Sequence, residues 1–421
     1  MAVFWPLGIA TAVIIGRWLG PAGKGEYTLA ILGGTLLFTL LNLGIPSSIS
    51  YFLSGQHAPE TSLVKSVIVL AALLAAAALA VALLLDRTGW CAYLFGVARL
   101  SPTVWAVMVG LPFYFVGTFL QFVILAQGHR VLFAALPSAG AIIVFLFTGI
   151  FVLLGKLTPL FAVGAVVASQ VFTGGALLVY EQLRVHWWGA PLLTRGIWKE
   201  LASYSVVSHA GNILQFLVQR VDVFMVGVML DVRAVGLYSV GYGVAELLLL
   251  LPQRLGTLYL PRMAAQDGSM GKAEEVRLSS SLVFVGTVIA AVFLSLIAPL
   301  GIRLLYGEAF APSVAPFLLL LPGICAMATC CILAAYLAGV GKVKINTAIA
   351  AVGVVSNVLL NLVLIPRFGI SGAAIASSLT YCTEAFLFIA AASRVTRARP
   401  ISMLTSASPS LVVGVLKRAF R

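Results

Sequence analysis

The sequence predicts an all-α integral membrane protein with about 12 transmembrane helices in two six-helix lobes that are related by a parallel repeat. Three observations support this prediction. Of 421 residues, 61% are hydrophobic and only 9% are charged, whereas roughly 25% of the residues in a soluble domain are charged. The apolar residues form runs long enough to cross a bilayer, and the second half of the chain repeats short motifs of the first.

The apolar runs define the elements in order. A spanning helix needs about 20 apolar residues, and the short connections leave no room for a soluble domain. The run at 2–16 is short for this purpose, so we expect a truncated first helix whose start precedes this chain. The predicted spans are 2–16, 28–53, 64–85, 104–127, 131–154, 158–180, 201–230, 234–259, 279–300, 313–337, 345–365 and 370–393.

The net charge of +13 reflects basic residues that gather on one side of this twelve-helix topology. That side carries 17 Lys and Arg residues and the other carries 8. By the positive-inside rule the richer side faces the cytoplasm, which places both termini there in a multi-pass inner-membrane protein. The charge therefore indicates contact with anionic lipid and not with nucleic acid. The predicted parts are an N-terminal lobe (1–182), a cytoplasmic interfacial linker (183–200), a C-terminal lobe (201–393) and a basic cytoplasmic tail (394–421).

An internal repeat supports the division into lobes. A shift of 211 residues lays the Gly-Glu-Tyr-Thr motif at 25–28 on the Gly-Leu-Tyr-Ser motif at 236–239, and it lays Gly128 on Gly339. Six helices is an even number, so both lobes have the same orientation and are related by an axis along the membrane normal. This pattern is typical of transporters that work by alternating access.

Several motifs resemble those of polysaccharide (O-antigen type) flippases of the multidrug/oligosaccharidyl-lipid/polysaccharide exporter superfamily. The resemblance covers nearly the whole chain, and its order and spacing are more specific than any single motif. The motifs are Arg17–Tyr27, Asp222 followed by Val226-Gly227 and Val235–Ser239, Leu304–Gly307 with Gly339–Lys342, and Asn357 followed by Leu364–Ala374.

The resemblance implies a transporter, not an enzyme. It implies that a polyprenyl-diphosphate-linked oligosaccharide is flipped from the inner to the outer leaflet for cell-surface polysaccharide synthesis. The implied partners are this lipid, other membrane lipids and other polysaccharide-assembly membrane proteins. Two alternatives remain open: an ion-coupled multidrug or organic-cation antiporter of the same superfamily and, with less support, a membrane glycosyltransferase or polymerase.

The segment 203–230 carries a polar face along its whole length. At about 100° per residue, Ser205, Ser208, Asn212, Gln215, Gln219 and Asp222 fall on one side of the helix, flanked by His209 and Arg220. Such a face is costly in hydrocarbon unless it meets protein or a water-filled cavity. The pattern predicts a substrate-binding cavity lined by Arg220, Asp222, Gln219, Gln215, Asn212, His209 and Ser208. The alternative is that these residues join neighbouring helices by hydrogen bonds.

Arg220 is the leading site residue, because a guanidinium stays charged and matches a diphosphate with paired hydrogen bonds. We expect Asp222 and Glu246 to hold it when the site is empty, although a purely structural pair with Glu246 would look the same. Glu246 and Glu384 are candidate coupling residues for H⁺ or Na⁺. No spacing of His, Cys or acidic residues indicates a metal site, and no motif indicates a cofactor.

The predicted orientation is tested with single cysteines. A cysteine at Lys199 should be shielded from an impermeant thiol reagent added outside cells, and one at Arg303 should react, because the two positions lie on opposite sides of the predicted topology. The reverse labelling pattern would overturn the orientation.

Overall fold

The computed structural model describes residues 4–54, 58–88, 101–265 and 269–406, and all secondary structure in these ranges is helical. The helices are α1 (Phe4–Leu41), α2 (Ile45–Ser54), α3 (Glu60–Thr88), α5 (Pro102–Ala126), α6 (Arg130–Leu153), α7 (Pro159–Val185), η1 (Trp187–Gly189), α8 (Arg195–Met229), α9 (Val232–Glu246), η2 (Leu247–Leu249), α10 (Leu250–Ala265), α11 (Ser269–Tyr306), η3 (Glu308–Ser313), α12 (Val314–Gly339), α13 (Val343–Thr396) and α14 (Ser402–Thr405).

Two of these helices each run through parts of two predicted spans: α1 covers 4–16 and the first part of 28–53, and α13 covers 345–365 and 370–393. The backbone leaves the helical conformation at Gly20 in α1 and at Gly369 in α13, where φ is 66° and 58°. These positive φ values are readily adopted by glycine, and Pro21 then starts a new segment at a position that needs no amide donor. With these breaks, the predicted apolar runs coincide with helix in the described residues, except that a turn at 42–44 divides the run 28–53 between α1 and α2. The predicted fold class is confirmed.

The repeat is visible in the turns as well as in the helices. The turn after α5 contains Gly128 at φ 84°, and the turn after α12 contains Gly341 at φ 76°. In both turns the glycine amide donates to the carbonyl three residues earlier. The structural equivalent of Gly128 is therefore Gly341 and not Gly339, so the constant shift of 211 is wrong at this point. The spacing to this turn is two residues longer in the second copy than in the first.

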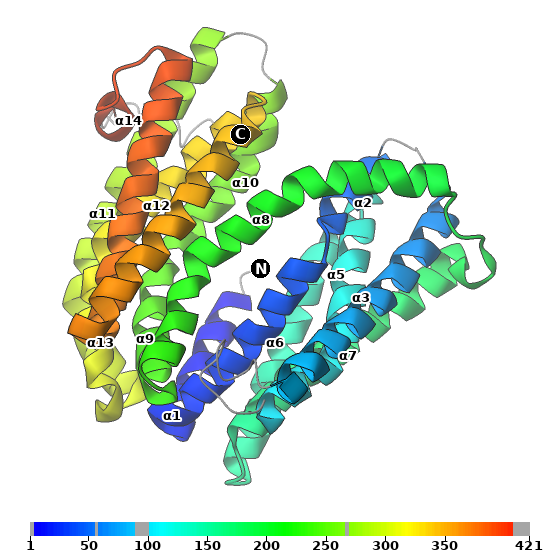
Figure 1. The fold of residues 1–421 in the computed structure, drawn as a ribbon, viewed down its shortest axis with the longest axis horizontal. Helices are drawn as coiled ribbons and strands as arrows, with labels where there is room; N and C mark the ends of the chain where they lie inside the picture. Colours follow the sequence, from blue (N-terminus) through cyan, green and yellow to red (C-terminus); the bar gives the residue numbers. More distant parts are fainter. Residues whose placement is uncertain (1–3, 55–57, 89–100, 266–268, 407–421) are drawn as a thin grey trace. The chain divides into compact units, whose positions relative to one another are not determined.

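The chain divides into two compact units. Unit 1 comprises 1–216 and 227–236, and unit 2 comprises 217–226 and 237–421. In unit 1, α5 packs against α1, α2, α3, α6 and α7, and its aromatic residues Phe115 and Phe119 are fully buried. In unit 2, α12 packs against α10, α11 and α13 around the buried Phe317. The repeat thus places equivalent helices, α5 and α12, at the centre of their own units (Figure 1).

Two glycines bring equivalent segments of the repeat into direct backbone contact within unit 1. A Cβ added at Gly25 would lie 1.8 Å from the carbonyl oxygen of Val232, and one added at Gly236 would lie 1.8 Å from that of Pro21. The two contacts are equivalent under the repeat, because positions 21 and 25 shifted by 211 residues become positions 232 and 236. No residue other than glycine fits at either position without separating the two backbones.

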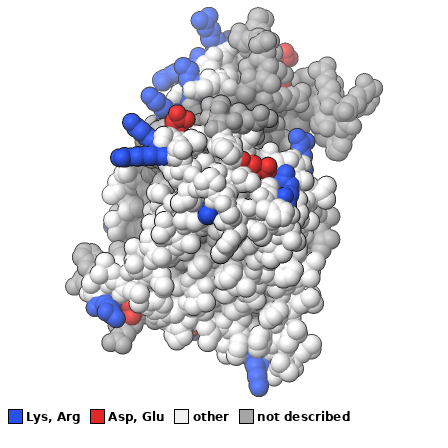
Figure 2. Space-filling view, turned by 90° about the vertical axis from the view of Figure 1, so that its right-hand side faces the viewer, with Lys and Arg blue, Asp and Glu red and all other residues white. Residues whose placement is uncertain are grey.

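The outer surfaces of the helices suit a lipid environment. On α11, Phe293, Leu296 and Leu300 are each more than 60% exposed and recur at helical spacing. The face drawn in Figure 2 has a broad uncharged area, with Lys and Arg side chains gathered towards its upper and lower ends. Exposed side chains of this kind would be unfavourable in water but match the hydrocarbon core of a bilayer.

The glycine contact yields a stability prediction. Gly236→Ala should lower the unfolding temperature and the folded yield, because its methyl group overlaps a backbone oxygen; overpacking of this kind costs about 1–3 kcal/mol. Gly243→Ala on the same helix is the matched control, since a Cβ there meets nothing within 4 Å. Thermal unfolding of the purified variants checks the difference, and equal stability of the two would contradict the close contact.

Candidate functional site

Arg220 lies on α8 and is held by two residues of α9. Its Nη1 donates to Glu246 Oε2 at 3.3 Å, and its Nη2 donates to Glu246 Oε1 at 3.1 Å. The guanidinium carbon lies 4.9 Å from the centre of the Tyr242 ring, and the Tyr242 hydroxyl donates to Glu246 Oε1 at 2.9 Å. The expected pairing with Glu246 is confirmed. The short turn between α8 and α9 makes it possible, because it brings the two helices together at similar depth.

The Arg220–Glu246 pair remains accessible. The side chains of Arg220 and Glu246 are 25% and 27% exposed. Nε of Arg220 makes no hydrogen bond within the described part of the chain, so the guanidinium retains a free donor. An anion can therefore approach Arg220 without unfolding its surroundings.

Asp222 occupies a different environment from the one we expected. It is fully buried, and its Oδ2 accepts hydrogen bonds from Tyr238 at 2.5 Å and from Ser377 at 2.7 Å. Its Oδ1 accepts from the backbone amide of Val223 at 2.8 Å. The expectation that Asp222 holds Arg220 is therefore wrong. Arg220 and Asp222 are two residues apart on α8, so their side chains point in directions about 200° apart, and that of Asp222 points inward.

The network around Asp222 extends into α13. Asn357 donates to Ser377 at 3.4 Å, and Asn361 donates to the Asn357 side chain at 2.7 Å. All three residues of α13 are fully buried. These donors satisfy both oxygens of the Asp222 carboxylate, and the network joins α8, α9 and α13 inside unit 2. In this conformation Asp222 serves helix packing.

The polar face of α8 changes character along its length. Ser205 is buried and donates to the Leu201 carbonyl, and it also hydrogen-bonds Ser48 of α2. His209 Nε2 lies 3.0 Å from the carbonyl oxygen of Leu40 in α1. These two residues join helices of unit 1. The side chain of Ser208 lies outside the described residues.

The next turns of α8 present amide side chains outward. Asn212 and Gln215 are exposed, Gln219 is partly exposed, and none of the three has a hydrogen bond in the described part of the chain. Unsatisfied amides are costly against lipid tails. This part of the face therefore suits a water-filled cavity, as the sequence predicts, whereas the part around Ser205 and His209 joins helices.

Glu384 is a buried acidic residue on α13. It is 3% exposed and has no hydrogen bond among the described residues. A Cβ added at Gly353 would lie 2.3 Å from Glu384 Oε1, so that glycine makes room for the carboxyl group. An acidic side chain in such surroundings is suited to gaining and losing a proton or cation.

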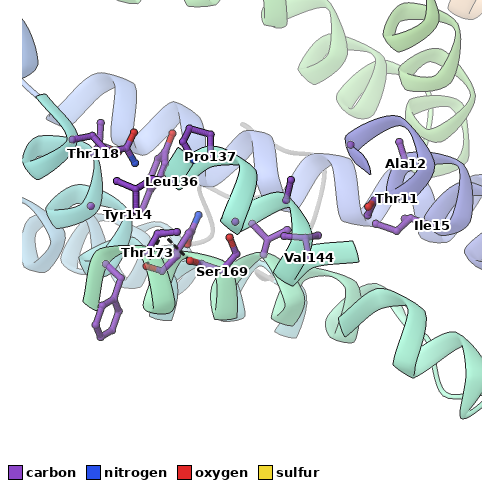
Figure 3. Close-up of a pocket in the computed structure, with 18 of the residues that line it drawn as sticks. Thr11, Ala12, Ile15, Tyr114, Thr118, Leu136, Pro137, Val144, Ser169 and Thr173 are labelled. Carbon is purple, nitrogen blue, oxygen red and sulfur yellow. Dashed lines mark hydrogen bonds between the residues drawn. The ribbon is translucent and has the colours of Figure 1, made fainter. Parts of the chain in front are cut away.

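Unit 1 contains a cavity of about 640 Å³ that sequence reasoning missed. It lies among α1, α5, α6 and α7, and Figure 3 shows side chains of all four helices around it. Most of the lining is apolar, but a set of hydroxyl and amide side chains interrupts it. The polar lining residues are Thr11, Lys24, Tyr27, Tyr114, Thr118, Gln121, Ser169, Gln170 and Thr173.

Lys24 is the charged residue of this cavity. It is 9% exposed, and its ammonium lies 5.0 Å from the centre of the Tyr27 ring. A cation–π contact contributes about 0.5–2 kcal/mol, whereas removing an ammonium from water costs several kcal/mol. The ring alone therefore does not offset the burial of the charge. Lys24 lies between the predicted spans 2–16 and 28–53, but the break at Gly20 puts it in the first turn of a helical segment. The Gly20-Pro21 pair was the available signal.

Two family profiles match this chain. The profile of the family described as polysaccharide biosynthesis protein matches residues 4–266, and the profile described as MatE matches 208–363. A comparison with curated proteins finds no match.

Several solved structures have a similar fold. An inward-facing multidrug resistance MATE family transporter of the MOP superfamily has a TM-score of 0.77 at 12% identity, covering 97% of both chains. The lipid II flippase MurJ, in an inward closed conformation, has a TM-score of 0.75 at 14% identity, covering 96% of this chain and 89% of its own. A MOP superfamily transporter from Pyrococcus furiosus, described as having a binding pocket of reverse polarity, has a TM-score of 0.58 at 14% identity, with 94% and 93% covered.

The exposed part of the α8 face yields a labelling prediction. Cysteines at Asn212 and Gln215 should react with a small hydrophilic thiol reagent in membranes, because their side chains are exposed and polar. A cysteine at Leu217 is the matched control, since it lies at similar depth on the opposite side of the helix. Equal labelling at all three positions, or none at Asn212 and Gln215, would show that the face does not line a water-filled cavity.

Proposed function

The chain belongs to the polysaccharide biosynthesis protein family, and from this we propose that it flips a polyprenyl-diphosphate-linked oligosaccharide from the inner to the outer leaflet by alternating access. It is a multi-pass membrane transporter of the MOP superfamily and not an enzyme. Within the proposal, 1–182 and 201–393 are the two lobes, 183–200 and 394–421 lie on the cytoplasmic surface, and both termini face the cytoplasm of a cell with an inner membrane.

The observation that carries the proposal is the accessible guanidinium of Arg220. A substrate diphosphate presents oxygens that a guanidinium binds with two parallel hydrogen bonds. Glu246 occupies that side of Arg220 in the present structure. The incoming diphosphate would replace Glu246, so the arginine has an anionic partner both with and without substrate. This exchange avoids leaving an unpaired charge in the membrane.

The exposed amides of α8 support recognition of the sugar. Asn212, Gln215 and Gln219 each offer both a donor and an acceptor, which matches the hydroxyl groups of an oligosaccharide. They occupy the turns of the helix that precede Arg220. Diphosphate and sugar contacts would thus follow one another along α8.

We assign coupling to an ion gradient to two acidic residues of unit 2, Glu246 and Glu384. When the diphosphate displaces Glu246, its carboxylate becomes free to accept a cation or proton. Glu384 is buried and lacks a hydrogen-bond partner in the described ranges, so it suits the same role. Binding at these carboxylates and binding at Arg220 would then influence each other reciprocally.

An ion-coupled multidrug or organic-cation antiporter is the second candidate. The MatE match over 208–363 and the buried Glu384 favour it. Arg220 opposes it, because an accessible guanidinium disfavours a cationic substrate. The two candidates therefore differ in the charge of the molecule that Arg220 would meet.

Transport measured in proteoliposomes tests the proposal. The protein should move a short-chain prenyl-diphosphate-linked N-acetylglucosamine between leaflets, and Arg220→Ala should remove nearly all of this activity. Arg220→Lys should retain part of it, because the charge stays while the planar fork is lost. Arg303→Gln is the matched control: it breaks another Arg–Glu pair, with Glu308, whose side chains are 54% and 77% exposed.

Loss of folding must be separated from loss of binding. Arg220→Gln with Glu246→Gln removes both charges, so no unpaired charge remains to destabilise the fold. This double variant should fold and still not transport the diphosphate. Full transport by the folded double variant would rule out the assigned role of Arg220. Transport of ethidium instead of the diphosphate lipid would favour the antiporter.

A further inference from the structure

We propose that the cavity of unit 1 is a second anion site, in which Lys24 binds the phosphate oxygens of a diphosphate. That the ligand is an anion is inferred from the cavity itself. Only the identification of the diphosphate as lipid-linked rests on the proposed function.

The charge balance of the cavity favours an anion. Lys24 is buried, and no Asp or Glu is among the residues that line the cavity in the described part of the chain. Glu26 is close in sequence, but it accepts a hydrogen bond from Thr103 and does not line the cavity. An ammonium sequestered in this way is stabilised by a partner of opposite charge, and the protein supplies none there.

The surrounding polar groups can bind the remaining oxygens of such an anion. Hydroxyl groups of Tyr114 and Thr118 line the same space as the amides of Gln121 and Gln170. The side-chain oxygen of Gln170 is buried without a hydrogen-bond partner. Because the two ends of an amide can exchange by rotation, Gln170 can present its NH₂ group to an anion in the cavity.

The size and the apolar lining indicate an amphiphilic anion. A cavity of about 640 Å³ is within the usual range of ligand sites. It is larger than a diphosphate alone needs. Ile15, Phe113, Leu136 and Val144 supply apolar walls beside the polar groups. An isoprenoid attached to the phosphate would contact these walls, whereas a free diphosphate would leave them exposed to water.

The competing explanation is that Lys24 is a packing residue that the Tyr27 ring satisfies. The two explanations differ in what an added anion does. A packing residue gains nothing from an anion, so binding and chemical protection would not depend on it. An anion site binds the probe, and Lys24 becomes shielded when the probe is present.

Direct binding to the purified full-length chain tests the site, with inorganic pyrophosphate and farnesyl diphosphate as separate probes. Lys24→Gln should weaken binding at least about tenfold, since each charge-assisted bond is strong, and Lys24→Arg should retain it. Lys156→Gln is the matched control, because Lys156 is exposed in the turn after α6 and makes the same charge change. Tighter binding of farnesyl diphosphate indicates a lipid-linked ligand, and equal binding of both probes indicates free diphosphate.

A measurement on the unmodified chain keeps the test independent of folding. Pyrophosphate should protect Lys24 but not Lys156 from an amine-acetylating reagent, as read by mass spectrometry. Equal binding by the wild type and Lys24→Gln, or equal acetylation of Lys24 with and without pyrophosphate, would overturn the anion site. Arg220→Gln should leave this protection intact, so failure of the proposed transport role and failure of the Lys24 site are separate results.

Discussion

A charge inside a bilayer needs a partner within the protein, and this constraint organises the polar interior of the chain. The partners of Arg220 are Glu246 and the Tyr242 ring. Asp222 instead accepts hydrogen bonds from Tyr238, Ser377 and the amide of Val223. In the described part of the chain, the Lys24 ammonium lies beside the Tyr27 ring and has no acidic residue in its cavity. Saturated charges such as Asp222 stabilise the fold, whereas incompletely satisfied ones mark the places where a ligand can contribute.

The same constraint acts on the backbone. Every amide in hydrocarbon must be bonded locally, so the described chain is helical and changes direction only at special positions. Gly20 and Gly369 provide two such positions with positive φ. The break at Gly20 also determines where Lys24 lies relative to the cavity. Backbone geometry and the chemistry of a potential site are therefore linked through a single glycine.

Much of the fold follows from apolar runs, because hydrophobic length is a strong signal for a spanning helix. The pairing of Arg220 with Glu246 was also foreseeable from a short turn between two helices. The inward orientation of Asp222 was not, because it depends on Ser377, which is distant in sequence. The apolar spans 2–16 and 28–53 leave Lys24 in the connection between them, because linear hydropathy does not register a helix that restarts at Pro21. Long-range contacts and local backbone breaks are what the sequence pattern leaves out.

The reciprocal packing of Gly25 and Gly236 bears on the origin of the chain. Residue 25 meets residue 232, and residue 236 meets residue 21, so each copy of the motif uses the same two positions to contact the other. This is the isologous geometry of a two-fold homodimer. A six-helix ancestor that paired with itself through this glycine would have needed one mutation to alter both sides. In a fused chain the two sides can change independently, so an asymmetric protein with one Lys24 and one Arg220 is compatible with the same contact.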